Sequence, residues 1–133
     1  MHFKHALSAA ALLLTCGSMA IAAPQDNEAK LAKAIEGRVA GKPVDCIYNP
    51  QIMNTRIIDK TAIIYDSGST IYVNRPDSGA SSLSQWDVLV TKPTNSQLCN
   101  TDIVQLYDSG TPHMQRGFVG LGKFVPYTKV KRH

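Results

Sequence analysis

Short runs of β-branched and aromatic residues, separated by turn-forming residues, dominate the chain beyond residue 43. The densest stretch is Ile52–Asn74, where only Asp59-Lys60 and Asp66-Ser67-Gly68-Ser69 interrupt the apolar runs. Apolar runs bounded by Asp, Ser and Gly predict three consecutive antiparallel strands. We expect this meander to nucleate the core.

The rest of the chain predicts further strands and a single helix. Arg75–Ser84 and Lys92–Gln97 are rich in Pro, Gly, Ser and Asn and are expected to be loops. The additional strands are expected at Val44–Tyr48, Trp86–Thr91, Leu98–Tyr107 and Gln115–Tyr127.

The helix is expected to begin near Asp26. Leu31, Ile35 and Val39 then recur at helical spacing, and Gly41 followed by Pro43 ends the pattern. The predicted fold is therefore all-β with one N-terminal helix, a small antiparallel β-barrel or sandwich of roughly six or seven strands.

The N-terminus has the features of a secretory signal. Lys4 precedes an apolar run from Ala6 to Leu14, and Ala20-Ile21-Ala22 supplies small residues at the cleavage positions. We expect a signal at 1–22, a helix and linker at 23–43, a β-domain at 44–128 and a basic tail at 129–133. The alternative is a lipoprotein anchored through Cys16, although Thr15 is a poor residue before an acylated cysteine.

The charge of the chain is concentrated at its ends. The sequence has 14 basic and 10 acidic residues, but Lys4 belongs to the signal and Lys129, Lys131 and Arg132 to the tail. The body is therefore neutral, and composition gives no reason to expect a nucleic-acid-binding face. The tail is expected to be solvated, with contact to anionic lipid as the alternative.

The sequence Tyr-Asp-Ser-Gly occurs twice, and it invites a catalytic interpretation. Asp66 and Asp108 each follow an apolar strand and precede Ser-Gly, as the paired carboxylates of aspartic peptidases do. A single-chain peptidase of that class needs two full lobes, for which this chain is short. Turn chemistry explains both motifs, and it predicts the same hairpin turn twice, with positive φ at Gly68 and Gly110.

Other candidate chemistry is weaker. His113 has no second histidine in the mature body with which to build a zinc site or a triad, and no dinucleotide or phosphate-binding loop is present. We therefore expect no metal and no cofactor. Trp86 is expected to be a core residue. Ion pairs or hydrogen bonds within the fold are the expected role of four charged residues near strand ends, Arg56, Asp59, Arg75 and Asp102.

Several segments resemble a known family. In order they are GRVAGKPVDCI, TRIIDKTAIIY, IYVNR, LCNTDIV and LGKFVPYTK, between residues 37 and 129. These are similar to segments of a DUF6491-like family of small secreted or lipid-anchored proteobacterial proteins of unknown function. The resemblance implies an exported envelope protein and no particular activity. Two further cysteines found in that family are absent here, where the chain has Gly79-Ala80-Ser81 and Val119-Gly120.

Removal of the signal would leave two of the three cysteines. In an oxidising compartment such a pair is expected to join, so Cys46 and Cys99 are predicted to form a disulfide. The alternative is two separately buried thiols.

The leading functional hypothesis is a periplasmic or secreted, non-enzymatic binding or accessory β-domain, with an envelope protein or lipid as partner and no transmembrane span in the mature chain. The alternative is an aspartic-peptidase-like hydrolase using Asp66 and Asp108. A deep pocket with convergent ionisable groups would favour an enzyme, whereas an exposed apolar patch would favour partner binding.

Overall fold

The computed structural model describes residue 17 and residues 23–92, 95–111 and 113–131. Gly17 is the one residue of the predicted signal that is described, so Cys16 lies outside the described residues. The last two residues of the predicted tail also lie outside them. The elements are α1 (Ala23–Ala34), β1 (Arg38–Ala40), β2 (Cys46–Tyr48), η1 (Asn49–Gln51), β3 (Asn54–Ile58), β4 (Ala62–Asp66), β5 (Thr70–Asn74), η2 (Ala80–Ser82), β6 (Asp87–Val90), β7 (Gln97–Cys99), β8 (Ile103–Asp108), β9 (Gln115–Gly120) and β10 (Phe124–Lys129).

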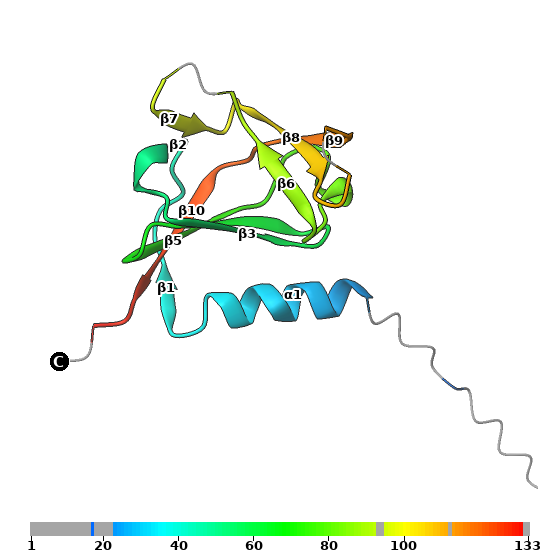
Figure 1. Cartoon of the computed structure of the whole chain (residues 1–133). Helices are drawn as coiled ribbons and strands as arrows, with labels where there is room; N and C mark the ends of the chain where they lie inside the picture. The colour runs from blue at the N-terminus through cyan, green and yellow to red at the C-terminus, as the bar shows by residue number, and fades with distance from the viewer. Residues whose placement is uncertain (1–16, 18–22, 93–94, 112, 132–133) are drawn as a thin grey trace, which may run out of the picture.

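The strands form three antiparallel sheets, which confirms the predicted all-β fold with one N-terminal helix (Figure 1). Their orders are β1-β10-β5-β4-β3, β2-β7 and β6-β8-β9. The sheets do not close into a barrel, so a sandwich-like arrangement describes the fold. Helix α1 covers one face of the five-stranded sheet, and the two smaller sheets lie on its other side.

The predicted meander is present as β3, β4 and β5. Ile57 pairs with Ile63, and Tyr65 pairs with Tyr72, so the strands run antiparallel in sequence order. The first Tyr-Asp-Ser-Gly turn joins β4 to β5 with φ of 92° at Gly68, as predicted. The prediction for Gly110 is wrong. The turn between β8 and β9 is longer, and the positive φ of 70° falls at His113.

Two predicted strands are each split by a turn, and β1 is a further strand that was not predicted, so the described residues contain ten strands. Between β7 and β8 the Asp102 carboxylate accepts a hydrogen bond from the Cys99 backbone N–H at 2.7 Å, and this fixes a tight turn. Between β9 and β10 the break contains Gly122, where an added Cβ would lie 2.3 Å from the Arg75 carbonyl oxygen. Only glycine fits so close to the neighbouring backbone.

The prediction that the helical pattern continues to Val39 is wrong. Helix α1 ends at Ala34, and Gly37 takes a φ of 75°, which turns the chain out of the helix. Val39 lies in β1 opposite Thr128 of β10, and its side chain is 56% exposed. Strand pairing with β10 therefore takes precedence over helical spacing. As a result the five-stranded sheet includes residues from Arg38 onward, whereas the β-domain was expected to begin at Val44.

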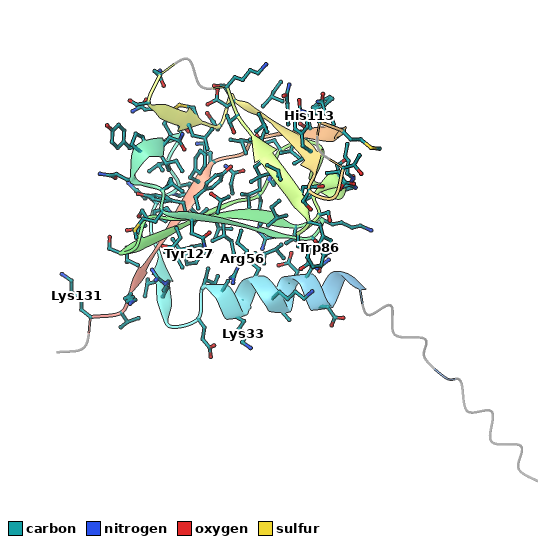
Figure 2. The ribbon with its side chains drawn as sticks, viewed as in Figure 1. Lys33, Arg56, Trp86, His113, Tyr127 and Lys131 are labelled. Carbon is teal, nitrogen blue, oxygen red and sulfur yellow. A yellow bond between two sulfur atoms is a disulfide. The ribbon has the colours of Figure 1, made fainter. Side chains whose placement is uncertain are left out.

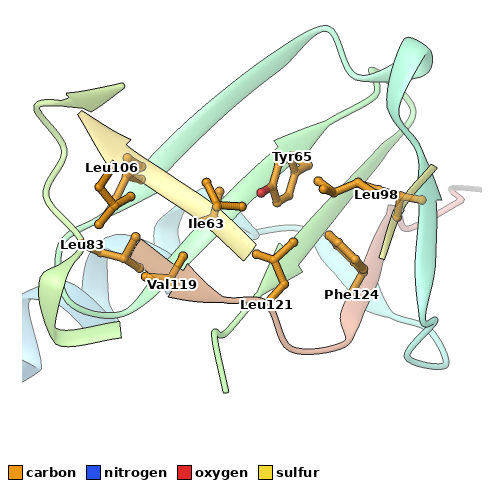
Figure 3. Close-up of a cluster of buried hydrophobic side chains, with 11 residues drawn as sticks. Ile63, Tyr65, Leu83, Leu98, Leu106, Val119, Leu121 and Phe124 are labelled. Atoms are coloured by element: carbon orange, nitrogen blue, oxygen red, sulfur yellow. The ribbon is translucent and has the colours of Figure 1, made fainter. Parts of the chain in front are cut away.

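The central strand β4 is buried on both faces because its side chains alternate between two clusters. Ile63 and Tyr65 join the main core between the sheets, shown in Figure 3. Ala62 and Ile64 instead pack under α1 with Leu31, which is 3% exposed. Full burial of a side chain such as leucine contributes about 1.5–3 kcal/mol, so Leu31 is the main anchor of the helix.

Among the described residues, one polar side chain is fully buried, that of Asn74 at the end of β5. The Asn74 amide donates to the Gly122 carbonyl oxygen at 2.7 Å and accepts from the Gly122 N–H at 2.9 Å. Both hydrogen bonds are buried, which fixes the end of β5 against the turn before β10. Among the described helices, none combines the length and apolar character needed to cross a membrane.

Candidate functional site

A groove of about 1020 Å³ lies between α1, the edge strand β3 and the start of β6. We call it the α1–β3 groove. Figure 2 shows Arg56 and Trp86 on the side of the sheet that faces α1. The lining residues are Lys30, Lys33, Ala34, Asn54, Thr55, Arg56, Ile57, Ile58, Asp59, Ile64, Asp66, Ile71, Gln85, Trp86, Asp87 and Leu89.

The groove has an apolar floor. Ile58, Ile64 and Ile71 line it where the cluster beneath α1 reaches the surface, and Leu89 lines it from the side of β6. The groove also touches both faces of β3, because Arg56 and Ile57 alternate across that strand. A hollow that contacts both faces of a strand runs along the edge of the strand.

The helical wall is held in place by packing and by an ion pair. Besides the buried Leu31, the Arg75 guanidinium donates to both carboxylate oxygens of Glu28, at 2.8 and 2.9 Å. These hydrogen bonds lower the pKa of Glu28 and raise that of Arg75. Both side chains are 55% exposed, so the pair contributes little stability. It does fix where the first half of α1 lies relative to β5.

Three cations line the groove without an ionic partner in the described part of the chain. Lys30 and Lys33 extend from α1, and Arg56 extends from the middle of β3. None of them has a described carboxylate oxygen within 4.0 Å. The charges of these three residues, which are among those that line the groove, are therefore available to a ligand.

The three carboxylates of the groove are already engaged. Asp87 forms an ion pair with Arg116 and has a side chain that is 1% exposed. The carboxylate of Asp59 accepts from the Gln85 N–H, and that of Asp66 accepts from the Gly68 N–H at 2.7 Å. These acids hold the surrounding loops, so the groove has no convergent pair of acids for general acid–base chemistry.

Trp86 lies on the rim of the groove. The prediction that it is a core residue is wrong, since it is 71% exposed. An exposed indole beside an apolar floor is a common feature of binding surfaces. Its position follows from the loop before β6, which the Asp59–Gln85 hydrogen bond fixes next to the β3–β4 turn.

The structure does not bring Asp66 and Asp108 together as a catalytic pair. Asp66 ends β4 in the five-stranded sheet, whereas Asp108 ends β8 in the three-stranded sheet. Each carboxylate accepts a hydrogen bond from its own turn, Asp66 from Gly68 and Asp108 from Gly110, both at 2.7 Å. Turn chemistry therefore accounts for both carboxylates, although the predicted positive φ at the glycine occurs only at Gly68.

The remaining sequence candidates have structural positions. Asp59, Arg75 and Asp102 make the ion pairs or hydrogen bonds within the fold that were expected of them. The same prediction for Arg56 is wrong, since its side chain has no hydrogen bond or ion pair in the described residues. His113 is an exposed loop residue (Figure 2). Within the described residues, no group of three or more His, Cys, Asp and Glu is placed to hold a metal ion.

The predicted disulfide between Cys46 and Cys99 is confirmed. The two cysteines are direct partners in the β2–β7 ladder, with Cα atoms 4.0 Å apart. The bridge joins the two strands of the smallest sheet, and it is compatible with an oxidising compartment.

A second surface lies on the outer side of the three-stranded sheet. Val88, Ile103 and Phe118 alternate with inward-facing neighbours and are 49%, 58% and 60% exposed. Gln105 and Tyr107 lie between them in the register, so the middle of this face carries no charged side chain. Exposed apolar faces of this kind are typical of surfaces that bind other molecules.

Comparison with known proteins identifies no relative: no family model, curated protein or solved structure matches the chain. The resemblance to the DUF6491-like family therefore stays a prediction.

Proposed function

We propose that the protein is an exported cell-envelope domain that binds an elongated anionic ligand in the α1–β3 groove and has no catalytic activity of its own. The observation that carries the proposal is the charge arrangement of the groove. Its carboxylates are engaged in the fold, whereas Lys30, Lys33 and Arg56 have no carboxylate partner among the described residues.

The shape and chemistry of the groove support binding rather than catalysis. It is long enough to follow β3 from Asn54 to Asp59 and has an apolar floor with an exposed indole at the rim. A ligand with an apolar part and a negative charge could bury the first on Ile58 and Ile64 and place the second at Arg56. Export is supported by the disulfide and by the features of the N-terminal sequence.

The only tryptophan of the chain supplies the assay. Trp86 is on the rim of the groove, so its fluorescence reports occupancy directly. The probe is 8-anilinonaphthalene-1-sulfonate, which has an aromatic body and a sulfonate. We expect saturable quenching of Trp86 by this probe.

A pair of charge reversals separates this groove from other sites. Lys30→Glu/Lys33→Glu should weaken binding about tenfold, because attraction becomes repulsion at two positions. Lys42→Glu/Lys131→Glu makes the same change in net charge at exposed lysines that do not line the groove, and it should bind as the wild type does. Equal affinity in both variants would show that the groove is not the site.

A further inference from the structure

The β3 strand has an unpaired edge that faces the α1–β3 groove. It is the last strand of the five-stranded sheet and pairs only with β4. Within the described residues, the backbone groups of Thr55, Arg56 and Ile57 make no hydrogen bond outside that ladder. The edge strand of the three-stranded sheet, β6, borders the same groove through Asp87 and Leu89.

The turn after β3 shows which backbone groups point into the groove. The Ile58 carbonyl accepts from the Thr61 N–H at 3.0 Å, so Ile58 belongs to a hydrogen-bonded position of the hairpin. Hydrogen-bonded positions alternate along an antiparallel pair. The N–H and C=O groups of Thr55 and Ile57 therefore point away from β4, toward the groove.

A strand added at this edge would meet different chemistry on its two faces. Side chains on the helix side would meet Lys30, Lys33 and Arg56, and side chains on the other side would meet Ile57 and Leu89. Because successive side chains of a strand point to opposite faces, the complementary sequence alternates acidic and apolar residues.

We infer that the ligand of the groove is an extended peptide segment of alternating acidic and apolar residues, which pairs through its backbone with Thr55 and Ile57 of β3. This inference rests on the proposed function and specifies its ligand. Backbone pairing provides affinity, and the alternating faces provide selectivity. Arg56 serves as the central contact for an acidic side chain.

The test uses synthetic peptides of about nine residues, which is within the range of strand lengths in globular proteins. The first alternates glutamate and valine, the second alternates lysine and valine, and the third is the glutamate peptide with alternate amides N-methylated. Binding to the full mature chain is followed by Trp86 fluorescence. Protection of the Thr55 and Ile57 amides is followed by hydrogen exchange.

We expect the glutamate peptide to bind, to protect both amides, and to exceed each of the other two peptides in affinity by about tenfold. Thr55→Pro should weaken it similarly, because proline removes an edge N–H that the β3–β4 ladder does not use. Circular dichroism checks that this variant folds, and the methylated peptide tests the same contact without changing the protein.

Each alternative result has a distinct meaning. Equal binding of the methylated or the lysine peptide would overturn the inference while leaving the groove as the ligand site. Binding of the naphthalene sulfonate but of no peptide would also overturn it. The charge of Arg56 would then serve to prevent other strands from pairing with the edge of β3. Failure of both the sulfonate and the peptides would overturn the proposed function as well.

Discussion

Removing the Cys46–Cys99 disulfide should lower the free energy of unfolding by about 4 kcal/mol. The perturbation is Cys46→Ala/Cys99→Ala, which takes away the covalent bond and leaves small apolar side chains in a sheet of two short strands. The neighbours Ile47 and Leu98 are 3% and 2% exposed, so the native packing of this sheet does not depend on the bond alone.

The magnitude follows from the loop that the bond closes. The cysteines are 53 residues apart in the sequence, and closing a loop of that length removes conformational entropy from the unfolded chain worth about 4 kcal/mol at room temperature. A domain of this size has a total stability on the order of 5–15 kcal/mol. The variant should therefore be marginally stable.

The measurement is urea unfolding of the protein followed by far-ultraviolet circular dichroism. Trp86 fluorescence is a poor probe of unfolding because the side chain is already 71% exposed in the folded state. The slope of the free energy with urea should rise in the variant, since an unfolded chain without the cross-link exposes more surface. Wild-type protein in a phosphine reductant should behave like the variant.

A loss below about 1 kcal/mol would refute this reasoning, because restriction of the unfolded chain would then not be the main effect of the bond. The reductant is controlled by adding it to the variant, whose stability should not change.

Three further substitutions probe the core. Asn74→Ala should cost about 3 kcal/mol in urea unfolding, because it leaves the buried N–H and C=O of Gly122 without partners; a cost near zero would contradict the assigned bonds. Gly122→Ala should cost more than about 2 kcal/mol, whereas the control Gly117→Ala, whose added Cβ would have its nearest neighbour at 3.7 Å, should be tolerated. Tyr65→Phe should stabilise the protein by about 1 kcal/mol, because the buried Tyr65 hydroxyl has no hydrogen-bond partner in the described structure. Burial raises the pKa of Tyr65, so above about pH 10 the phenol loses its proton in the unfolded chain but keeps it in the folded one. The free energy of unfolding of the wild type should therefore fall relative to that of Tyr65→Phe by about 1.4 kcal/mol per pH unit. Parallel dependence of the two stabilities on pH would contradict the burial of the phenol.

The parts of the fold that depend on local signals could be predicted. The meander follows from apolar runs and turn residues that are adjacent in the sequence, and the disulfide follows from the cysteine count together with the expectation of export. Val39 could not be placed in the same way. Its helical spacing from Leu31 and Ile35 predicts a helix, whereas its β-branched side chain favours a strand. Pairing with β10, which is distant in the sequence, decides for the strand.

Trp86 shows a related limit. An aromatic residue at the start of a predicted strand is usually buried, and only the loop held by Asp59 brings it to the surface. The splitting of the last strands also depends on distant contacts, since Gly122 is fixed by Asn74 and by the Arg75 backbone. Such contacts join residues far apart in the chain, and no local pattern records them.

The groove depends on which strand ends the sheet and on where α1 lies, and neither is visible in the order of residues. One sequence signal did point to it. Arg56 shares a face of β3 with Ile58, so a charged group has to lie on a face that is otherwise buried under α1. Within the fold such a residue needs an ionic partner or an opening to solvent. The structure provides the opening, which is lined by Arg56 and also by Lys30 and Lys33 of α1. None of the three has a described carboxylate oxygen within 4.0 Å. A stable fold does not need three unpaired cations around an apolar floor, and this is the physical reason to look for the ligand there.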